Sequence, residues 1–151
     1  MRDADGTLLR VIQKPTEPKV VTESDKQRLM DAIRKLMTDQ GVPPAAVQQV
    51  LQGASIADQY PAMGQLLVGP GGSIWMQRIK TAEEVSAEGE FNPQDLGSNE
   101  WEVFDETGRY LGVMVTPERF APLRVLGDAF WGVQRDEFDV PSVVRYRLVR
   151  D

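Results

Sequence analysis

The stretch that decides the fold is Asp105-Glu-Thr-Gly-Arg-Tyr-Leu-Gly-Val-Met-Val-Thr-Pro117, because its pattern also occurs near the start of the chain. The other copy is Asp3-Ala-Asp-Gly-Thr-Leu-Leu-Arg-Val-Ile-Gln-Lys-Pro15, so both follow D-x2-G-x2-L-x-V-x3-P. An Asp and a Gly three positions apart are typical of a tight turn. The Leu and Val that follow lie two apart, on one face of a strand that the Pro ends. Each copy therefore predicts a hairpin turn followed by a half-buried strand.

Short apolar segments separated by turn residues fill the chain from Gly64 onwards, and they predict a mainly β protein. They group into antiparallel units of four strands, here labelled A to D. One complete unit covers 64–69, 73–80, 100–105 and 108–115, and strands A to C of a second cover 122–127, 129–136 and 142–149. Residues 7–14 would be a lone D strand. Four-stranded units that recur in this way are typical of β-propeller blades. Trp75 and Trp131 occupy corresponding places in strand B, and we expect both to be largely buried.

A helical insertion at about 22–52 is predicted between the blades, within the connection 15–63. Thr22 or Ser24 can cap a first helix that ends before Gly41. A second, short helix follows Pro43 and Pro44. The run 81–99, with four glutamates and an Asn-Pro, predicts a long exposed loop. We therefore expect residues 1–151 to be a single β-propeller fragment that carries this insertion.

The composition excludes several classes of site. The chain of 151 residues has no cysteine and no histidine, which removes disulfides, a cysteine nucleophile, thiolate metal sites and the commonest general base. A net charge of −6 argues against nucleic-acid binding. No apolar run approaches the roughly 20 residues of a membrane span, and residues 1–15 lack the apolar segment that is typical of a signal peptide. We expect a soluble protein, cytoplasmic when expressed, with neither nucleic acid nor membrane as partner.

Several segments carry a resemblance to a known family. The segments are Leu67-Val68 with Ile74-Trp75, the stretch Trp101-Glu-Val-Phe-Asp-x2-Gly-Arg-Tyr-Leu-Gly112, and the closing Gly132-Val-x-Arg-Asp-Glu-x3-Pro-Ser-Val-Val-x-Tyr-Arg-Leu148. Together they resemble the C-terminal part of bacterial six-bladed β-propeller proteins of the NHL/TolB-like group. The resemblance implies a six-bladed propeller, in a group that includes binding scaffolds and metal-dependent hydrolases. This chain holds only about two blades.

Candidate functional residues lie in the long connections, because long loops on a rigid scaffold usually carry binding functions. The tight A–B and C–D turns would lie on one rim and the connections 15–63, 80–99 and 136–142 on the other. We expect ligand-binding residues on that long-loop face, namely Arg78, Glu83, Glu84, Arg135, Asp136, Glu137 and Asp139.

Two functions remain open for this face. The first is a non-catalytic module that binds a small ligand or a protein. The second is a metal-assisted hydrolase of esters, lactones or phosphotriesters, in which Asp136, Glu137 and Asp139 hold Ca²⁺ or another divalent cation. The simpler alternative for these carboxylates, which we favour, is a solvated acidic rim with structural ion pairs. A chelator combined with hydrolase assays would separate the two functions.

The strand count predicts an oligomer. A lone D strand at the start and an A-B-C unit at the end leave edges open, and proteins cover or pair such edges. If residues 7–14 of one copy complete the second unit of its neighbour, each chain contributes two blades. Six blades then need three chains, which predicts a C3 homotrimer with strand exchange. A dimer of similar blades or a domain-swapped pair is the alternative. A frayed terminus is the simpler interpretation of residues 3–15, but their match to 105–117 favours half of a hairpin.

Overall fold

A computed structural model describes residues 5, 11 and 13–149 of the chain. The predicted strand 7–14 therefore falls largely outside the described residues. The chain divides into two compact units, which are described separately below. The first contains 65–78 and 99–151 together with 1–16, and the second contains 17–64 and 79–98.

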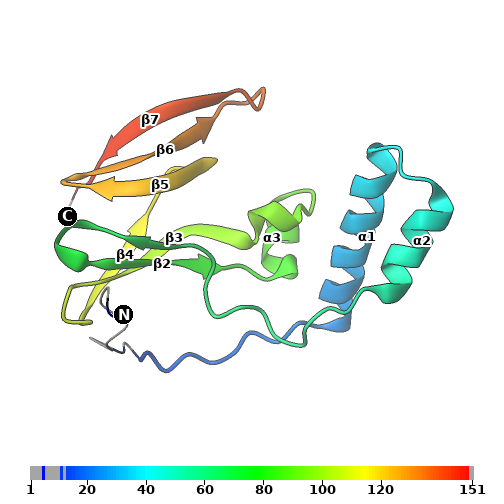
Figure 1. The fold of residues 1–151 in the computed structure, drawn as a ribbon, viewed down its shortest axis with the longest axis horizontal. Helices are drawn as coiled ribbons and strands as arrows, with labels where there is room; N and C mark the ends of the chain where they lie inside the picture. Colours follow the sequence, from blue (N-terminus) through cyan, green and yellow to red (C-terminus); the bar gives the residue numbers. More distant parts are fainter. Residues whose placement is uncertain (1–4, 6–10, 12, 150–151) are drawn as a thin grey trace. The chain divides into compact units, whose positions relative to one another are not determined.

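The first unit contains two antiparallel sheets, as predicted (Figure 1). The four-stranded sheet has the order β1-β2-β3-β4, with β1 at Leu66–Val68, β2 at Ile74–Ile79, β3 at Gly97–Phe104 and β4 at Tyr110–Val115. The three-stranded sheet has the order β5-β6-β7, with β5 at Phe120–Leu126, β6 at Ala129–Arg135 and β7 at Pro141–Arg147. Each strand pairs with the next one along the chain, so both sheets are simple meanders. These seven strands, all in the described part of the chain, agree with the seven predicted after residue 64.

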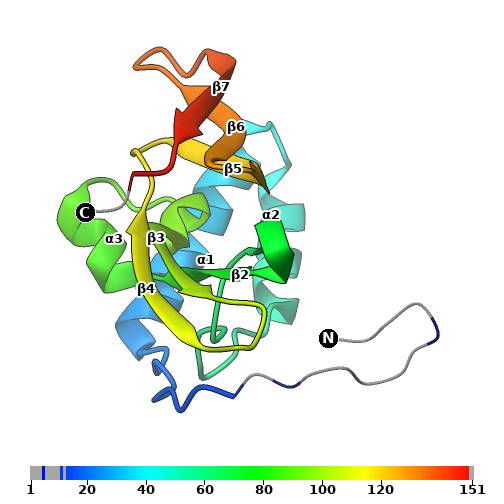
Figure 2. The same ribbon diagram turned by 90° about the vertical axis from the view of Figure 1, so that its left-hand side faces the viewer.

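The repeated Asp-x2-Gly pattern forms the predicted turn between β3 and β4, which lie side by side (Figure 2). The Asp105 Oδ1 atom accepts hydrogen bonds from the Thr107 N–H at 2.8 Å and the Arg109 N–H at 3.0 Å. Gly108 has a φ of +86°, a conformation that a Cβ would disfavour. The Thr107 hydroxyl donates a further hydrogen bond at 2.6 Å, which is the main cause that lowers the pKa of Asp105, and the two backbone bonds add to it. The carboxylate therefore holds the hairpin turn.

The two sheets pack face to face around one hydrophobic core in this unit. Its buried side chains are Leu67, Trp75, Trp101, Val103, Phe120, Val125 and Phe130. Two edge-to-face aromatic pairs lie in this core: Trp75 with Phe130 between the sheets, and Phe120 with Tyr146 within the second sheet. We call the sides of the sheets that contain the core their inner faces and the opposite sides their outer faces.

The predicted burial of the two tryptophans is correct for Trp75 and wrong for Trp131. Trp75 is 8% exposed on the inner face of the first sheet, whereas Trp131 is 41% exposed. Strand alternation explains the difference, because Phe130 occupies the inner position of β6 and places Trp131 on the outer face. The predicted apolar pair after the repeated turn also lies outward, with Leu111 50% and Val113 41% exposed, while Met114 packs on the core.

The second unit is mainly helical. Helix α1 spans Glu23–Asp39 and helix α2 spans Pro44–Gly53, in agreement with the predicted insertion at about 22–52. Thr22 and Asp25 form a capping box at the start of α1. The predicted loop 81–99 instead contains helix α3 at Ala82–Glu88 and a 3-10 turn at Pro93–Leu96. No helix in the described part of the chain is long and apolar enough to cross a membrane.

The two long connections that leave the first unit pack against each other. The Lys19 ammonium lies 2.8 Å from the Glu84 carboxylate, and the Tyr60 hydroxyl lies 2.8 Å from the Ala82 nitrogen. Lys35 of α1 forms an ion pair with Glu90. Residues 17–64 and 79–98 thus form one folded unit, whereas the sequence predicted an insertion and a separate loop.

Candidate functional site

The predicted site residues lie in three separate local environments. Arg78 lies on β2, Glu83 and Glu84 lie in the first turn of α3, and Arg135, Asp136, Glu137 and Asp139 lie at the β6–β7 turn. Glu83 and Glu84 belong to the second unit, and the others belong to the first.

Arg78 lies on the outer face of the first sheet in a network of charges. Its guanidinium contacts the Glu100 carboxylate at 2.6 Å and the Glu102 carboxylate at 3.2 Å. Lys14 forms a further ion pair with Glu102 and lies 5.6 Å above the Tyr110 ring. Burial raises the pKa of Glu102, but the hydrogen bonds from Lys14 and Arg78 outweigh it, so the pKa lies below its usual value. Both carboxylates thus have structural ion-pair partners.

Glu84 completes a capping box at the start of α3. Its carboxylate accepts a hydrogen bond from the Thr81 N–H at 2.6 Å, and the Glu84 N–H donates to the Thr81 hydroxyl at 3.1 Å. Hydrogen bonds from Lys19, and then from the Thr81 backbone, lower the pKa of Glu84. Its neighbour Glu83 is exposed. The arrangement stabilises the N-terminus of the helix, where a negative charge is favourable.

The β6–β7 turn brings Arg135 and Asp139 into contact. The Arg135 guanidinium lies 2.9 Å from the Asp139 carbonyl oxygen and 3.2 Å from its carboxylate. Arg119 contacts the same carboxylate at 3.4 Å. Both Arg119 and Asp139 have positive φ angles, +56° and +63°, which few non-glycine residues adopt. The two arginines therefore flank one strained aspartate at the tip of the sheet.

The acids at this turn have structural roles. The Asp136 Oδ1 atom accepts hydrogen bonds from the Phe138 and Val140 N–H groups, each at 2.9 Å, as Asp105 does in the β3–β4 turn. In the part of the chain that the structure describes, no three carboxylates lie close enough together to hold a metal ion. The divalent cation at Asp136, Glu137 and Asp139 remains a prediction, and the observed contacts are those of structural ion pairs and a turn.

A buried polar junction in the second unit was missed from the sequence. Asp25 is 2% exposed, and its Oδ2 atom accepts hydrogen bonds from the Thr22 N–H and hydroxyl. Tyr60 is 8% exposed, and its hydroxyl accepts the hydrogen bond from the Ala82 N–H. Burial is the main cause that raises the pKa of Tyr60, and the nearby Asp25 adds to it. Tyr60 thus links the starts of α1 and α3.

A basic and aromatic surface on the outer face of the second sheet was also missed. We define the Trp131 face by Arg124, Trp131, Val133, Val143, Arg145 and Arg147, which cross-strand pairing places on one side. The Arg145 guanidinium lies 6.0 Å from the centre of the Trp131 ring. Asp128 contacts Arg145 at 3.2 Å and Arg147 at 3.1 Å. The alternation of Val143, Arg145 and Arg147 in the sequence was the available signal.

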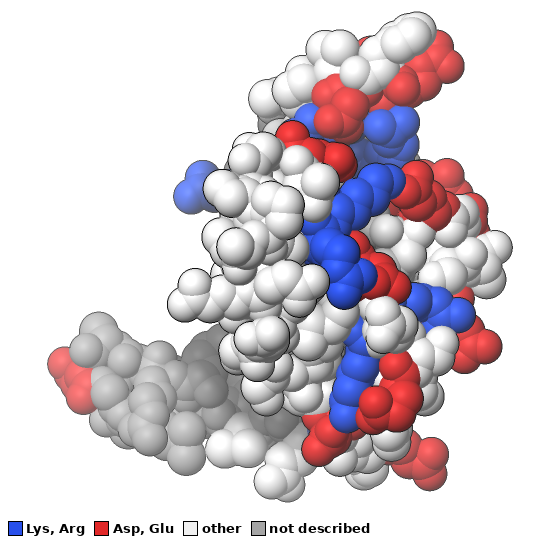
Figure 3. All heavy atoms as spheres, turned by 90° about the vertical axis from the view of Figure 1, so that its right-hand side faces the viewer, with Lys and Arg blue, Asp and Glu red and all other residues white. Residues whose placement is uncertain are grey.

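The remaining charges are mixed in sign. On the face that Figure 3 shows, lysine and arginine side chains lie directly beside aspartates and glutamates. Helix α1 contributes such pairs, including Lys26 with Asp58 and Arg34 with Asp31. This pattern differs from the single basic field that nucleic-acid-binding surfaces present.

Comparisons with protein-family models, with curated proteins and with solved structures found no match for this chain. Its function is therefore inferred from the residues and contacts described above.

Proposed function

We propose that the chain is a β-propeller module, in which β1–β4 form one blade and β5–β7 form three strands of a second. The supporting observation is the face-to-face packing of two sequential antiparallel meanders through Trp75 and Phe130. Propellers are built by repeating such sheets around a channel. The proposal also agrees with the repeated D-x2-G-x2-L-x-V-x3-P pattern, which includes strand β4 in its second copy.

The module completes a six-bladed ring by self-association. Strand β7 pairs with β6 on one side, and within the described residues no strand pairs with its other side. Residues 7–14 share the sequence pattern of β4, so this segment of a second copy is the fourth strand in our proposal. Three copies then supply six blades, and a head-to-tail contact of this kind closes as a ring.

The second unit provides the binding surface of this module. Its two segments are the long connections of the first blade, and they are joined by buried contacts such as Tyr60 with Ala82. Long connections on a rigid sheet scaffold usually carry binding functions. We propose that they bind a small ligand or a protein.

Light scattering and electron microscopy test the ring together. The chain has a mass of 16.9 kDa, and we expect a particle of three times that mass whose class averages show six radial blades. A monomer at all concentrations would contradict the self-association, and a particle without radial blades would contradict the propeller.

A further inference from the structure

The two sheets of the first unit differ in how their equivalent tryptophans are covered. Trp75 on β2 lies on the inner face and is covered by the second sheet, leaving it 8% exposed. Trp131 on β6 lies on the outer face and is 41% exposed. Both residues lie in the second strand of their sheet. If the two sheets are equivalent units, the Trp131 face is the side on which a further sheet would pack.

The composition of the Trp131 face fits a protein interface. Leu126 and Val143 of the second sheet are 52% and 79% exposed, so apolar area lies on this face beside the tryptophan. Arg145 and Arg147 are held next to it by Asp128. Tryptophan and arginine are among the residues most enriched at the energetic centres of protein interfaces. Three arginines against one aspartate make this surface positive in a chain of net charge −6.

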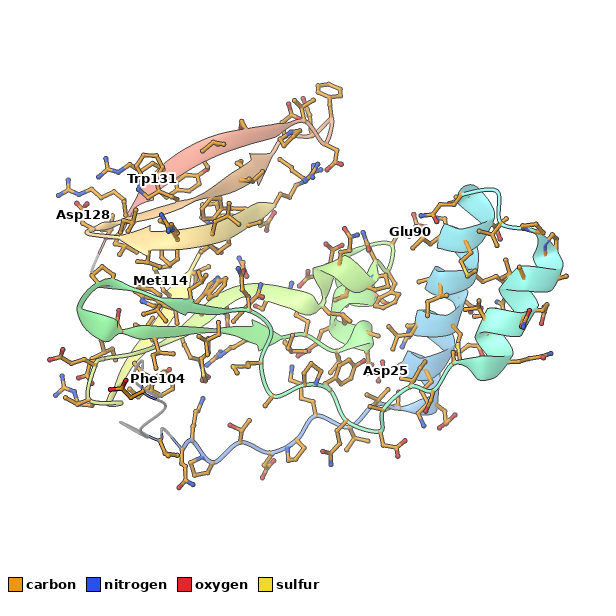
Figure 4. The ribbon with its side chains drawn as sticks, in the orientation of Figure 1. Asp25, Glu90, Phe104, Met114, Asp128 and Trp131 are labelled. Atoms are coloured by element: carbon orange, nitrogen blue, oxygen red, sulfur yellow. The ribbon has the colours of Figure 1, made fainter. Side chains whose placement is uncertain are left out.

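A second apolar surface lies on the outer face of the first sheet. Its exposed apolar side chains are Leu66 at 47%, Val68 at 58%, Val113 at 41% and Val115 at 63%. The charges on this face balance, because Glu100 and Glu102 are paired with Arg78 and Glu102 also with Lys14. Figure 4 shows Phe104 on this side of the sheet and Met114 on the inner side. The face is thus apolar with balanced charges, so it carries no positive excess that would repel the Trp131 face.

We propose that the Trp131 face of one copy packs on the outer face of β1–β4 of a second copy. This contact repeats between chains the sheet-on-sheet packing that Trp75 and Phe130 make within one chain. It rests on the proposed function, because it names the surfaces through which the propeller modules join. It also accounts for the outward Leu111 and Val113, since the repeated L-x-V pair then lies in the interface.

The absence of cysteine from the chain allows a direct test by cross-linking. One variant carries Val143→Cys, a second carries Val68→Cys, and the two are mixed and mildly oxidised. We expect a disulfide-linked heterodimer. In a matched control, the variant Gly53→Cys takes the place of Val68→Cys. Gly53 lies at the end of α2 in the other unit, so we expect at least tenfold less cross-linking. Equal cross-linking in both mixtures would contradict the proposal.

A charge variant gives a second, independent readout. Arg145→Glu combined with Arg147→Glu should reduce the mass by light scattering to that of one chain, with an unchanged circular dichroism spectrum. The control Arg109→Glu changes an arginine that is 78% exposed at the β3–β4 turn and should leave the assembly intact. The contrary outcome is that the doubly substituted chain still forms the oligomer while positions 143 and 68 fail to cross-link. That result would contradict the proposed interface surfaces but not the proposed ring.

The mass of the unsubstituted chain in solution shows whether only this interface is wrong or the proposed self-association as well. A monomer would overturn both this interface and the proposed self-association. If the thiol that Val143→Cys introduces into such a monomer also resists a thiol reagent, the Trp131 face is covered by a segment of its own chain instead of a second copy.

Discussion

The Trp75 indole meets the Phe130 ring edge to face, with the ring centroids 5.1 Å apart and the planes at 90°. Since Trp75 lies on β2 and Phe130 on β6, this contact joins the two sheets. Both side chains are buried, at 8% and 2% exposed. Trp75→Ala should therefore lower the free energy of unfolding by about 3–5 kcal/mol, the usual cost of a large aromatic truncation. Urea unfolding followed by circular dichroism would measure it.

The matched control for this prediction is Trp131→Ala. Trp131 is 41% exposed, so its truncation should cost less than about 1.5 kcal/mol in a dilute, monomeric sample. Equal costs at the two tryptophans would show that Trp131 is as deeply packed as Trp75. At concentrations where the chain associates, the cost at Trp131 should increase, because binding linkage then adds to stability.

Gly132 on β6 lies close to the backbone of β5. A Cβ at this position would lie 2.3 Å from the Ala121 carbonyl oxygen and 2.6 Å from a Phe120 ring carbon. The carbonyl oxygen belongs to the β5 backbone and cannot move without shifting the sheet, so Gly132→Ala should destabilise the protein by about 1–3 kcal/mol, as other overpacked sites do. Thermal unfolding of Gly53→Ala provides the control, since nothing lies within 4 Å of a Cβ there. Gly53 is the last residue of α2, so this control should not lower the stability. A neutral Gly132→Ala would contradict the close approach.

The strands could be predicted because they carry two independent local signals. Alternating apolar residues and turn residues delimit each one, as Asp105 and Gly108 do between β3 and β4. The exposure of Trp131 could not be predicted. Aligning the sequences of β2 and β6 does not show which face of each sheet another sheet covers. Helix α3 was missed although Thr81-Ala-Glu-Glu84 matches a capping box, because its glutamates also fit an exposed loop.

In the candidate site too, local contacts could be predicted from the sequence and long-range contacts could not. The proximity of Arg135 and Asp139 follows from their spacing of four residues across a turn, and the structure shows their ion pair. The contact of Tyr60 with Ala82 joins positions 22 residues apart. Nothing periodic marks residues 54–63, so only the folded chain reveals this link.

Tyr60→Phe should loosen the second unit and leave the first unchanged. The substitution removes the oxygen that accepts the Ala82 N–H, and Ala82 is fully buried at 0% exposed. An unpaired buried donor costs about 1–3 kcal/mol. Amide hydrogen exchange should therefore accelerate at Ala82 and in α3, with no change in β5–β7. Tyr110→Phe is the control, since this tyrosine is 48% exposed. Unchanged exchange at Ala82 in Tyr60→Phe would contradict the assigned role.

Glu102→Gln should weaken the fold in a pH-dependent manner. The hydrogen bonds from Lys14 and Arg78 outweigh the effect of burial and hold the folded-state pKa of Glu102 below its reference value of 4.5. A carboxyl with a lowered pKa contributes stability above the unfolded-state pKa and loses it as the pH falls through the folded-state pKa. We therefore expect Glu102→Gln to cost about 1–3 kcal/mol at pH 7, because Lys14 and Arg78 each lose a carboxylate contact. Urea unfolding from pH 7 to pH 3 should show this cost shrink below pH 4.5. Glu106→Gln, at an exposed position of the β3–β4 turn, should match the unsubstituted protein throughout. A cost at Glu102 that stays constant over this range would show that the side chain acts by packing and not through its charge.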